Sequence, residues 1–258
     1  MGDVTTISWS QATWNPWIGC QKVGPGCDNC YAEARDQRFE GGVHWGPGAE
    51  RRRTSLANWR KPYRWNRLAM EAGVRTRVFC ASLADVFDNA IDPQWRRDVA
   101  AVIRDTPHLD WMLLTKRIGL VNRMIERDFD GDLPRNVWMG ASVVTQEEAD
   151  RDIPKLLEVD AAVRWLSMEP LLESVRIDTE QMRTLDMIVV GGESGGKARR
   201  MSLEWARDLL RQARAGETAF HFKQMSQADH PSTFNDPEAF PEDLLVRELP
   251  SSGEVAHA

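Results

Sequence analysis

The sequence predicts an α/β fold, a partial TIM-like (β/α) barrel with six or seven parallel strands. Short apolar runs rich in β-branched residues recur along the chain, and each is followed by a polar or glycine-containing segment and then an amphipathic helix. From the second run onward the starts are separated by roughly 20 to 35 residues, the length of a βα unit with its loops. The runs are apolar on both sides, as expected of strands covered on both faces. An open, doubly wound sheet is the second choice.

Seven segments are expected to form these strands. They are a run near Ile7 and residues 77–83, 109–115, 136–144, 163–168, 185–192 and 219–224.

Capping residues mark three of the helices between these strands. Asp92 precedes Pro93 and can cap a helix there. Thr145 begins a second helix, which Pro154 is expected to kink or split. Ser202 begins a third, for which Gly216 can take the left-handed conformation that ends a helix.

Length and composition set the class of protein. The chain has 258 residues, 42% hydrophobic and 28% charged, with a formal net charge of −6, which is ordinary for a globular protein and argues against a uniformly basic nucleic-acid binder. It shows no secretory signal and no apolar run long enough to cross a bilayer, so we expect a cytoplasmic protein without a membrane partner. Residues 1–224 are expected to form the barrel domain, and residues 225–258, with four prolines, an irregular C-terminal extension.

Three of the four cysteines lie within eleven residues, at Cys20, Cys27 and Cys30, whereas Cys80 lies fifty residues further on. In a reducing cytoplasm, clustered thiols are more often metal ligands or catalytic groups than disulfides. The C-x2-C pair is expected at the start of a helix, with Asp28 as one of its two candidate caps and Asn29 as the other.

The number of protein ligands that the chain can supply distinguishes a zinc site from an iron–sulfur cluster. A structural zinc site needs four ligands, and the fourth would be Cys80, His44 or Asp28, although the chain has no second closely spaced pair. A four-iron, four-sulfur (4Fe–4S) cluster held by three thiolates fits the count better, because it leaves one iron open for another ligand. The cluster is therefore favoured and zinc stays open as the alternative.

Polar residues follow every expected strand. In parallel α/β folds the ligand site lies at the carboxyl ends of the strands. The residues there are Ser82 and Asp85, Thr115 to Arg117, Gly140 and Ser142, Ser167 to Pro170, the glycine-rich stretch 191–196, and Lys223 with Gln224.

The stretch "GGESGGKA", residues 191–198, has the spacing of a phosphate-binding loop, except that Ala198 replaces the hydroxyl residue that would hold magnesium. The next helix is expected to begin only at Ser202, so its dipole would not face a bound phosphate. A glycine-rich loop that lets Glu193 approach a ligand is the better hypothesis, and a plain tight turn is nearly as good.

A basic segment, residues 51–67, carries seven basic residues and no acidic one. Interleaved basic and aromatic side chains suit phosphate contact and base stacking, so a nucleotide or nucleic acid could bind here. The candidate contacts are Arg60, Lys61, Arg64 and Arg67. The slightly favoured alternative is a solvated helix whose Trp59, Trp65 and Leu68 pack against the barrel.

A three-cysteine loop after the first strand of such a barrel resembles the radical S-adenosylmethionine superfamily. The ordered blocks "WNPWIGC", "GCDNCYAE", "SLADVF", "LLTKR", "VWMGASV", "SMEPLL", "GGESG" and "FKQ" resemble a bacterial and phage three-cysteine family, often encoded near a three-Cys-motif partner protein.

The superfamily resemblance implies that Cys20, Cys27 and Cys30 hold a 4Fe–4S cluster. It also implies that S-adenosylmethionine is cleaved to a 5′-deoxyadenosyl radical with an electron from an external donor. By position, the candidate cofactor contacts are Asp85, Ser142, Ser167 and Glu169, and the candidate catalytic residues are Lys223, Glu193 and Cys80. The rival hypothesis is a non-enzymatic, zinc-stabilised module that binds nucleic acid through the basic segment.

Overall fold

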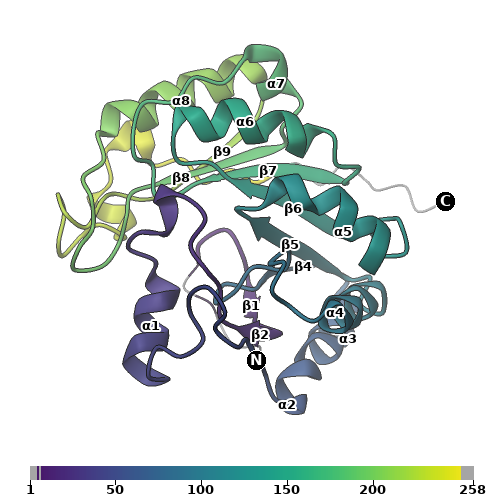
Figure 1. Cartoon of the computed structure of the whole chain (residues 1–258). Coiled ribbons are helices and arrows are strands. Elements are labelled where there is room, and N and C mark those ends of the chain that lie inside the picture. The colour runs from purple at the N-terminus through teal and green to yellow at the C-terminus, as the bar shows by residue number, and fades with distance from the viewer. Residues whose placement is uncertain (1–4, 6, 251–258) are drawn as a thin grey trace. The chain divides into compact units, whose positions relative to one another are not determined.

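A computed structural model describes residues 5 and 7–250 of the chain (Figure 1). It confirms the predicted fold class, an α/β fold with the parallel strands of a partial TIM-like barrel. The strand order is β1-β4-β5-β6-β7-β8-β9, and β1 with β4, β4 with β5, β7 with β8 and β8 with β9 all pair in parallel. The strands are β1 (Ala12–Trp14), β4 (Thr76–Cys80), β5 (Leu109–Thr115), β6 (Val137–Ser142), β7 (Val163–Met168), β8 (Met187–Gly191) and β9 (Ala219–Gln224). Two short strands, β2 (Trp17–Ile18) and β3 (Arg52–Arg53), form a separate antiparallel pair.

The chain divides into two compact units, residues 1–139 with 159–162, and residues 140–158 with 163–258. The described part of the first unit contains α1 (Tyr31–Phe39), α2 (Leu56–Trp59), α3 (Lys61–Ala72), α4 (Pro93–Arg104) and α5 (Val121–Asp128). The second contains α6 (Gln146–Leu157), α7 (Thr179–Arg183) and α8 (Leu203–Gly216). The expected boundary at residue 224 stays a prediction.

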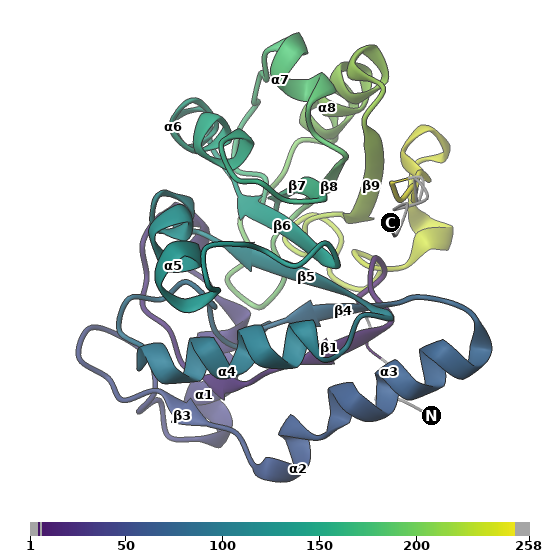
Figure 2. The same ribbon diagram turned by 90° about the vertical axis from the view of Figure 1, so that its right-hand side faces the viewer.

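In the first unit, α3 and α4 run along one side of β1 and β4, and α1 lies on the other side of β1 (Figures 1 and 2). Tryptophans fill the core between these layers. Trp14, on β1, meets Trp59 and Trp111 edge to face with ring centroids 5.1 and 5.3 Å apart. Such pairs add to the free energy gained from apolar burial. This packing explains several of the chain's eleven tryptophans.

In the second unit, α6, α7 and α8 lie together on one face of β7, β8 and β9 (Figure 1). The strands carry nearly uninterrupted buried side chains, as the sequence indicated. After β9 the chain has only two short 3-10 helices among the described residues, at Pro237–Ala239 and Glu242–Leu244. Residues 251–258, the end of the expected extension, lie outside the described residues.

The predicted first strand near Ile7 is wrong over its described part, because the backbone turns there and Ser10 N–H donates to Ile7 O at 3.2 Å. The strand lies a few residues later, at Ala12–Trp14. Trp9 supplied the apolar signal, but it packs edge to face on Phe79 from the turn. The other six predicted strands are confirmed, with ends shifted by up to three residues.

The predicted helix starts are confirmed, since the side chains of Asp92, Thr145 and Ser202 each accept a backbone N–H of the helix they precede. Pro154 does not split α6, because Ile153 and Leu156 are buried beside it and this packing outweighs the lost backbone hydrogen bond.

Gly216 is not the left-handed residue that ends α8. Glu217 is, with a φ of 58°. Gly216 is needed inside the helix, where a Cβ would come within 2.5 Å of Met182 Cγ. No helix of residues 5 and 7–250 is both long and apolar enough to cross a membrane.

Candidate functional site at the cysteine loop

The cysteine loop, residues 19–31, lies in the first unit and follows β2. Cys20 forms an isolated parallel bridge with Trp45. Cys27 ends a 3-10 helix, and Cys30 is the N-cap residue of α1. All three are partly exposed free thiols. The expected cap of α1 at Asp28 or at the residue after it is wrong, because the helix begins later and the backbone N–H of Asp28 instead closes the preceding 3-10 turn on Pro25 O.

Both ends of the loop are fastened to the segment that follows β4. Gly19 N–H donates to Leu83 O at 3.0 Å, and Tyr31 Oη donates to Ser82 O at 2.6 Å. The three cysteines therefore lie on a loop that is closed against the carboxyl end of a parallel strand, the place where this class of fold positions ligands.

A second loop, residues 44–51, packs against Cys20. Gly46 N–H donates to Cys20 O at 2.9 Å. Arg51 Nη1 donates to the carbonyl oxygens of His44, Gly46 and Ala49, at 3.3, 3.3 and 2.8 Å. Arg51 is 5% exposed, and its Nε donates to Asp88 Oδ2 at 3.0 Å. One buried guanidinium thus fixes the shape of this second loop.

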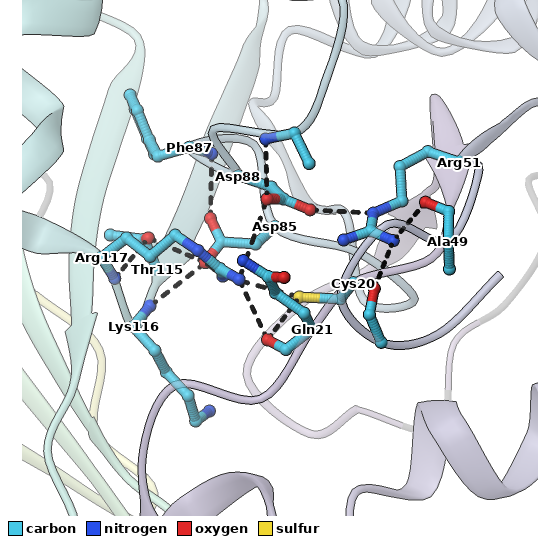
Figure 3. Close-up of polar contacts among 12 residues, drawn as sticks. Cys20, Gln21, Ala49, Arg51, Asp85, Phe87, Asp88, Thr115, Lys116 and Arg117 are labelled. Carbon is cyan, nitrogen blue, oxygen red and sulfur yellow. Dashed lines mark hydrogen bonds and ion pairs between the residues drawn. The ribbon is translucent and has the colours of Figure 1, made fainter.

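Arg117, at the end of β5, connects the cysteine loop to Asp85 (Figure 3). Its Nη1 donates to Asp85 Oδ2 at 2.8 Å and lies 3.5 Å from Cys20 Sγ, within hydrogen-bonding range for sulfur. Its Nη2 donates to Gln21 O at 3.0 Å. Arg117 and Asp85 are 7% and 5% exposed, so water screens this ion pair little.

The Asp85 carboxylate is occupied by protein donors. Oδ1 accepts Phe87 N–H at 2.9 Å, and Oδ2 accepts Thr115 Oγ1 at 2.9 Å and Lys116 N–H at 3.3 Å besides Arg117. These contacts hold Asp85 in one orientation. Its predicted role as a cofactor contact stays a prediction.

The pKa of Cys20 is raised to about 11, chiefly by burial and then by the charge of Asp85, while the charge of Arg117 and its hydrogen bond lower it in part. Cys20 is therefore a neutral thiol at pH 7, and a metal must displace its proton to bind. Burial also raises the pKa of Cys80, which lies fully buried in β4.

The choice between an iron–sulfur cluster and zinc stays a prediction. In the described part of the chain, no three His, Cys, Asp or Glu side chains are placed to hold one metal ion. Of the expected fourth zinc ligands, Cys80 is inside the sheet and His44 Nδ1 is bonded to Asp36 Oδ1 at 2.8 Å.

A buried nitrogen beside the loop supports an anionic occupant. Arg51 Nη2 is buried and has no hydrogen-bond partner among the described residues. The Arg51 side chain packs on Gly19, directly before Cys20. Three thiolates on a cluster, or the carboxylate of an amino acid, are groups that such an N–H would bond.

A second group of predicted site residues lies in the second unit. Val143 N–H donates to Ser167 O at 3.0 Å, so the ends of β6 and β7 are adjacent. Ser167 Oγ bonds Glu169 Oε1 at 3.4 Å, and Lys223 Nζ forms an ion pair with Glu169. Ser142 Oγ is buried without a hydrogen-bond partner among the described residues. The ends of β7 and β9 thus place the Ser167 hydroxyl, the Glu169 carboxylate and the Lys223 ammonium together. At the adjacent end of β6, the Ser142 hydroxyl has no hydrogen-bond partner among the described residues.

Glu193, in the glycine-rich loop, is bonded to Arg199 of the same loop. It is 7% exposed and accepts Arg199 through N–H, Nε and Nη2, at 2.8, 2.9 and 2.6 Å. This bidentate ion pair closes the glycine-rich loop on itself. The helix after the loop begins only at Leu203, as expected.

The basic segment is mostly solvated. Arg64 and Arg67 are exposed on α3, Arg60 is exposed between α2 and α3, and Lys61 is half-buried. Trp59 and Trp65 pack in the core, as the favoured alternative expected, whereas Leu68 is 39% exposed. Of the three interleaved aromatic side chains, Tyr63 alone is exposed.

The sequence did not assign a role to Arg51, Asp88 or Arg117. From the sequence, Arg117 counts only as a polar residue at a strand end. The arginine in "LLTKR" and the aspartates in "LADVFD" are nevertheless opposite charges that follow two expected strands, and this pattern could have indicated an ion pair. Arg51 was counted as part of the basic segment, yet it is buried and paired.

The solved structures similar to this chain are of spore photoproduct lyase. A mutant with dinucleoside spore photoproduct has a TM-score of 0.54 at 12% identity, covering 86% of this chain and 79% of that one. A second mutant has a TM-score of 0.53 at 12% identity with the same coverage. A third, with bound AdoMet and dinucleoside spore photoproduct, has a TM-score of 0.48 at 12% identity, and this chain covers only 64% of its length.

The first two likenesses show that this chain shares the fold of those structures. The chain belongs to the family described as "Protein of unknown function (DUF5131)", whose model matches residues 4–241. No curated protein matches the chain by sequence.

Proposed function

We propose that this chain is a radical S-adenosylmethionine-type enzyme in which Cys20, Cys27 and Cys30 hold a 4Fe–4S cluster. The observation that carries the proposal is three free, partly exposed thiols on one loop, closed against a strand end of a fold of this type. When bound, the cluster and S-adenosylmethionine would supply a 5′-deoxyadenosyl radical that removes a hydrogen atom from a substrate.

The chain's own residues have separate tasks in this proposal. The fastened loop carries three partly exposed cysteines, and Arg51, which packs on Gly19 directly before Cys20, offers an N–H without a partner among the described residues. Ser142, Ser167 and Glu169 would bind hydroxyl or ammonium groups of S-adenosylmethionine, since the Ser142 hydroxyl lacks a partner among the described residues. Lys223, which is paired with Glu169, is the best placed of the candidate catalytic residues, ahead of Glu193 and Cys80.

A nucleotide or nucleic acid is the substrate class we propose. The support is the exposed basic face of α2 and α3, with Arg60, Arg64 and Arg67 and the half-buried Lys61. Phosphate contacts of this kind weaken steeply with salt. Replacing Arg64 and Arg67 with glutamate should therefore weaken binding of a single-stranded oligonucleotide and flatten its salt dependence, whereas Arg135→Glu, at an exposed arginine elsewhere in the unit, should do neither.

The partners follow from the same proposal. An external one-electron donor is required, and the three-cysteine sequence blocks suggest a three-Cys-motif partner protein. Co-purification of the two proteins from one cell would support that pairing.

Anaerobic reconstitution tests the proposal directly. The protein is loaded with iron and sulfide, its metals are counted, and 5′-deoxyadenosine is measured after addition of S-adenosylmethionine and dithionite. About four irons per chain and deoxyadenosine formation are expected. Stoichiometric zinc without iron, together with unfolding on chelation, would instead support the zinc-stabilised nucleic-acid-binding module.

A further inference from the structure

We infer that Arg117 is a positioning residue that holds the sulfur of Cys20 and raises the reduction potential of the metal group bound there. The inference rests on the proposed function, because it concerns a cluster bound by Cys20. It assigns to Arg117 a role that neither the sequence blocks nor the fold defines.

The Arg117 guanidinium contacts both Cys20 and Gln21. Arg117 offers Nη1 toward Cys20 Sγ at 3.5 Å and Nη2 to Gln21 O at 3.0 Å. The Cys20 thiol itself is placed to donate to Gln21 O, also at 3.5 Å. A metal-bound thiolate has no proton to donate, so the Arg117 side chain would still bond both Cys20 Sγ and Gln21 O after the thiol's own hydrogen bond is lost.

Arg117 is itself held in place by Asp85 and Thr115. Asp85 Oδ2 accepts both Arg117 Nη1 at 2.8 Å and Thr115 Oγ1 at 2.9 Å. Thr115 Oγ1 in turn accepts the backbone N–H of Arg117 at 2.9 Å. Thr115 thus fixes the backbone of Arg117, and Asp85 fixes its guanidinium. Such support is expected for a group whose orientation matters.

Arg117 belongs to a network of buried charges. Asp88 lies between the two buried arginines, with Oδ2 at 3.0 Å from Arg51 Nε and Oδ1 at 3.8 Å from Arg117 Nη2. Two guanidinium groups and the carboxylates of Asp85 and Asp88 balance in charge. Arg117 Nη1, which donates to Asp85, is thus held at 3.5 Å from the Cys20 sulfur within a network whose formal charges balance.

The effect on a cluster follows from charge. A reduced cluster and its thiolates carry one more negative charge than the oxidised form. A hydrogen bond to a ligating sulfur stabilises the more negative state, so it raises the reduction potential. Removing the Arg117 N–H should make the potential more negative.

The test compares variants in an anaerobic redox titration followed by electron paramagnetic resonance. Arg117→Gln should bind as much iron as the wild type but titrate at a more negative potential. Arg117→Lys should lie between them, because lysine keeps the charge but lacks the fork. Thr115→Val should shift the potential in the same direction by less. Arg75→Gln removes an arginine of the same unit that is bonded to Asp110 Oδ1 and Leu109 O, at the other end of β5 from Arg117, and should leave the potential unchanged.

The outcomes are separable. An unchanged potential in Arg117→Gln, with normal iron content, overturns the inference and leaves the proposed function intact. If Arg117→Gln does not fold, the lysine and Thr115→Val variants decide by the same criterion. A wild-type protein that binds no iron refutes the proposed function itself.

Discussion

The backbone carbonyl of His44 occupies the space in which a Cβ on Gly19 would stand. Gly19 has a φ of 115° and directly precedes Cys20, so this contact shapes the cysteine loop. We predict that Gly19→Ala destabilises the protein by about 2 to 4 kcal/mol, from backbone strain and the clash together. Urea unfolding measures this difference.

Gly48→Ala is the matched control. Gly48 is also left-handed, with a φ of 72°, but no atom lies within 4 Å of the point at which its Cβ would stand. Its substitution should cost only the strain, about 1 kcal/mol. Equal losses in the two variants would show that the contact with His44 does not shape the loop.

The four cysteines should fall into two classes. Cys20, Cys27 and Cys30 are partly exposed on one loop, whereas Cys80 is fully buried in β4 and neutral. Alanine at any of the three loop positions should abolish most iron uptake after reconstitution. Cys80→Ala should retain it, at a stability cost of about 1 kcal/mol. Iron and sulfide are counted per chain, and iron loss in Cys80→Ala would assign that thiol as a ligand.

The fold could be predicted from the sequence because its signals are local and repeated. Runs such as 109–115 and 163–168 are apolar along most of their length, and Asp92 with Pro93 marks a helix start without ambiguity. The first strand was misplaced because Trp9 is a buried apolar residue that packs on Phe79 from a turn and does not belong to a strand.

The site was predictable only in part. Three clustered cysteines are a pattern of residue types, so they were found. The ion pair of Arg117 with Asp85 joins residues 32 positions apart, and that of Arg51 with Asp88 joins residues 37 positions apart. The helix and strand periods of a sequence do not predict contacts over such separations. Arg51 also stands in a basic segment whose neighbours are solvated, which disguised its burial.

Ser142 gives a prediction in which stability and binding change in opposite directions. Its hydroxyl is buried without a partner among the described residues, which costs free energy in the ligand-free protein. Ser142→Ala should therefore leave unfolding unchanged or stabilise the protein by about 1 kcal/mol, while weakening S-adenosylmethionine binding several-fold.

Ser10→Ala is the comparison for that variant. Ser10 is also buried, but its Oγ donates to Ala12 O at 3.1 Å. Its loss should destabilise by about 1 kcal/mol and leave cofactor binding unchanged. Calorimetric titration with S-adenosylmethionine and urea unfolding separate the two effects. Normal binding by Ser142→Ala would exclude its hydroxyl as a cofactor contact.

Asp128 should make the stability of the first unit dependent on acid. Burial opposes its charge, but hydrogen bonds from Arg127 and Arg96 outweigh burial and hold the pKa of Asp128 below its ordinary value. Arg96 Nη1 lies 2.6 Å from Asp128 Oδ2, and neither side chain is exposed. A carboxylate with a lowered pKa in the folded state stabilises fully above its unfolded pKa of about 3.9, and this contribution is lost as pH falls through the folded pKa.

Asp128→Asn should therefore cost about 3 to 5 kcal/mol at pH 7, because it leaves the charge of Arg96 buried and unpaired. The difference from the wild type should shrink as the pH falls below 4, as measured by urea unfolding at a series of pH values. Asp160→Asn is the control. The Asp160 side chain is 75% exposed, and its Oδ1 lies 3.5 Å from Nη1 of the exposed Arg135. It should change stability by less than about 0.5 kcal/mol at every pH. A deficit in Asp128→Asn that persisted undiminished at pH 3 would show that the loss arises from packing and not from the charge of the carboxylate.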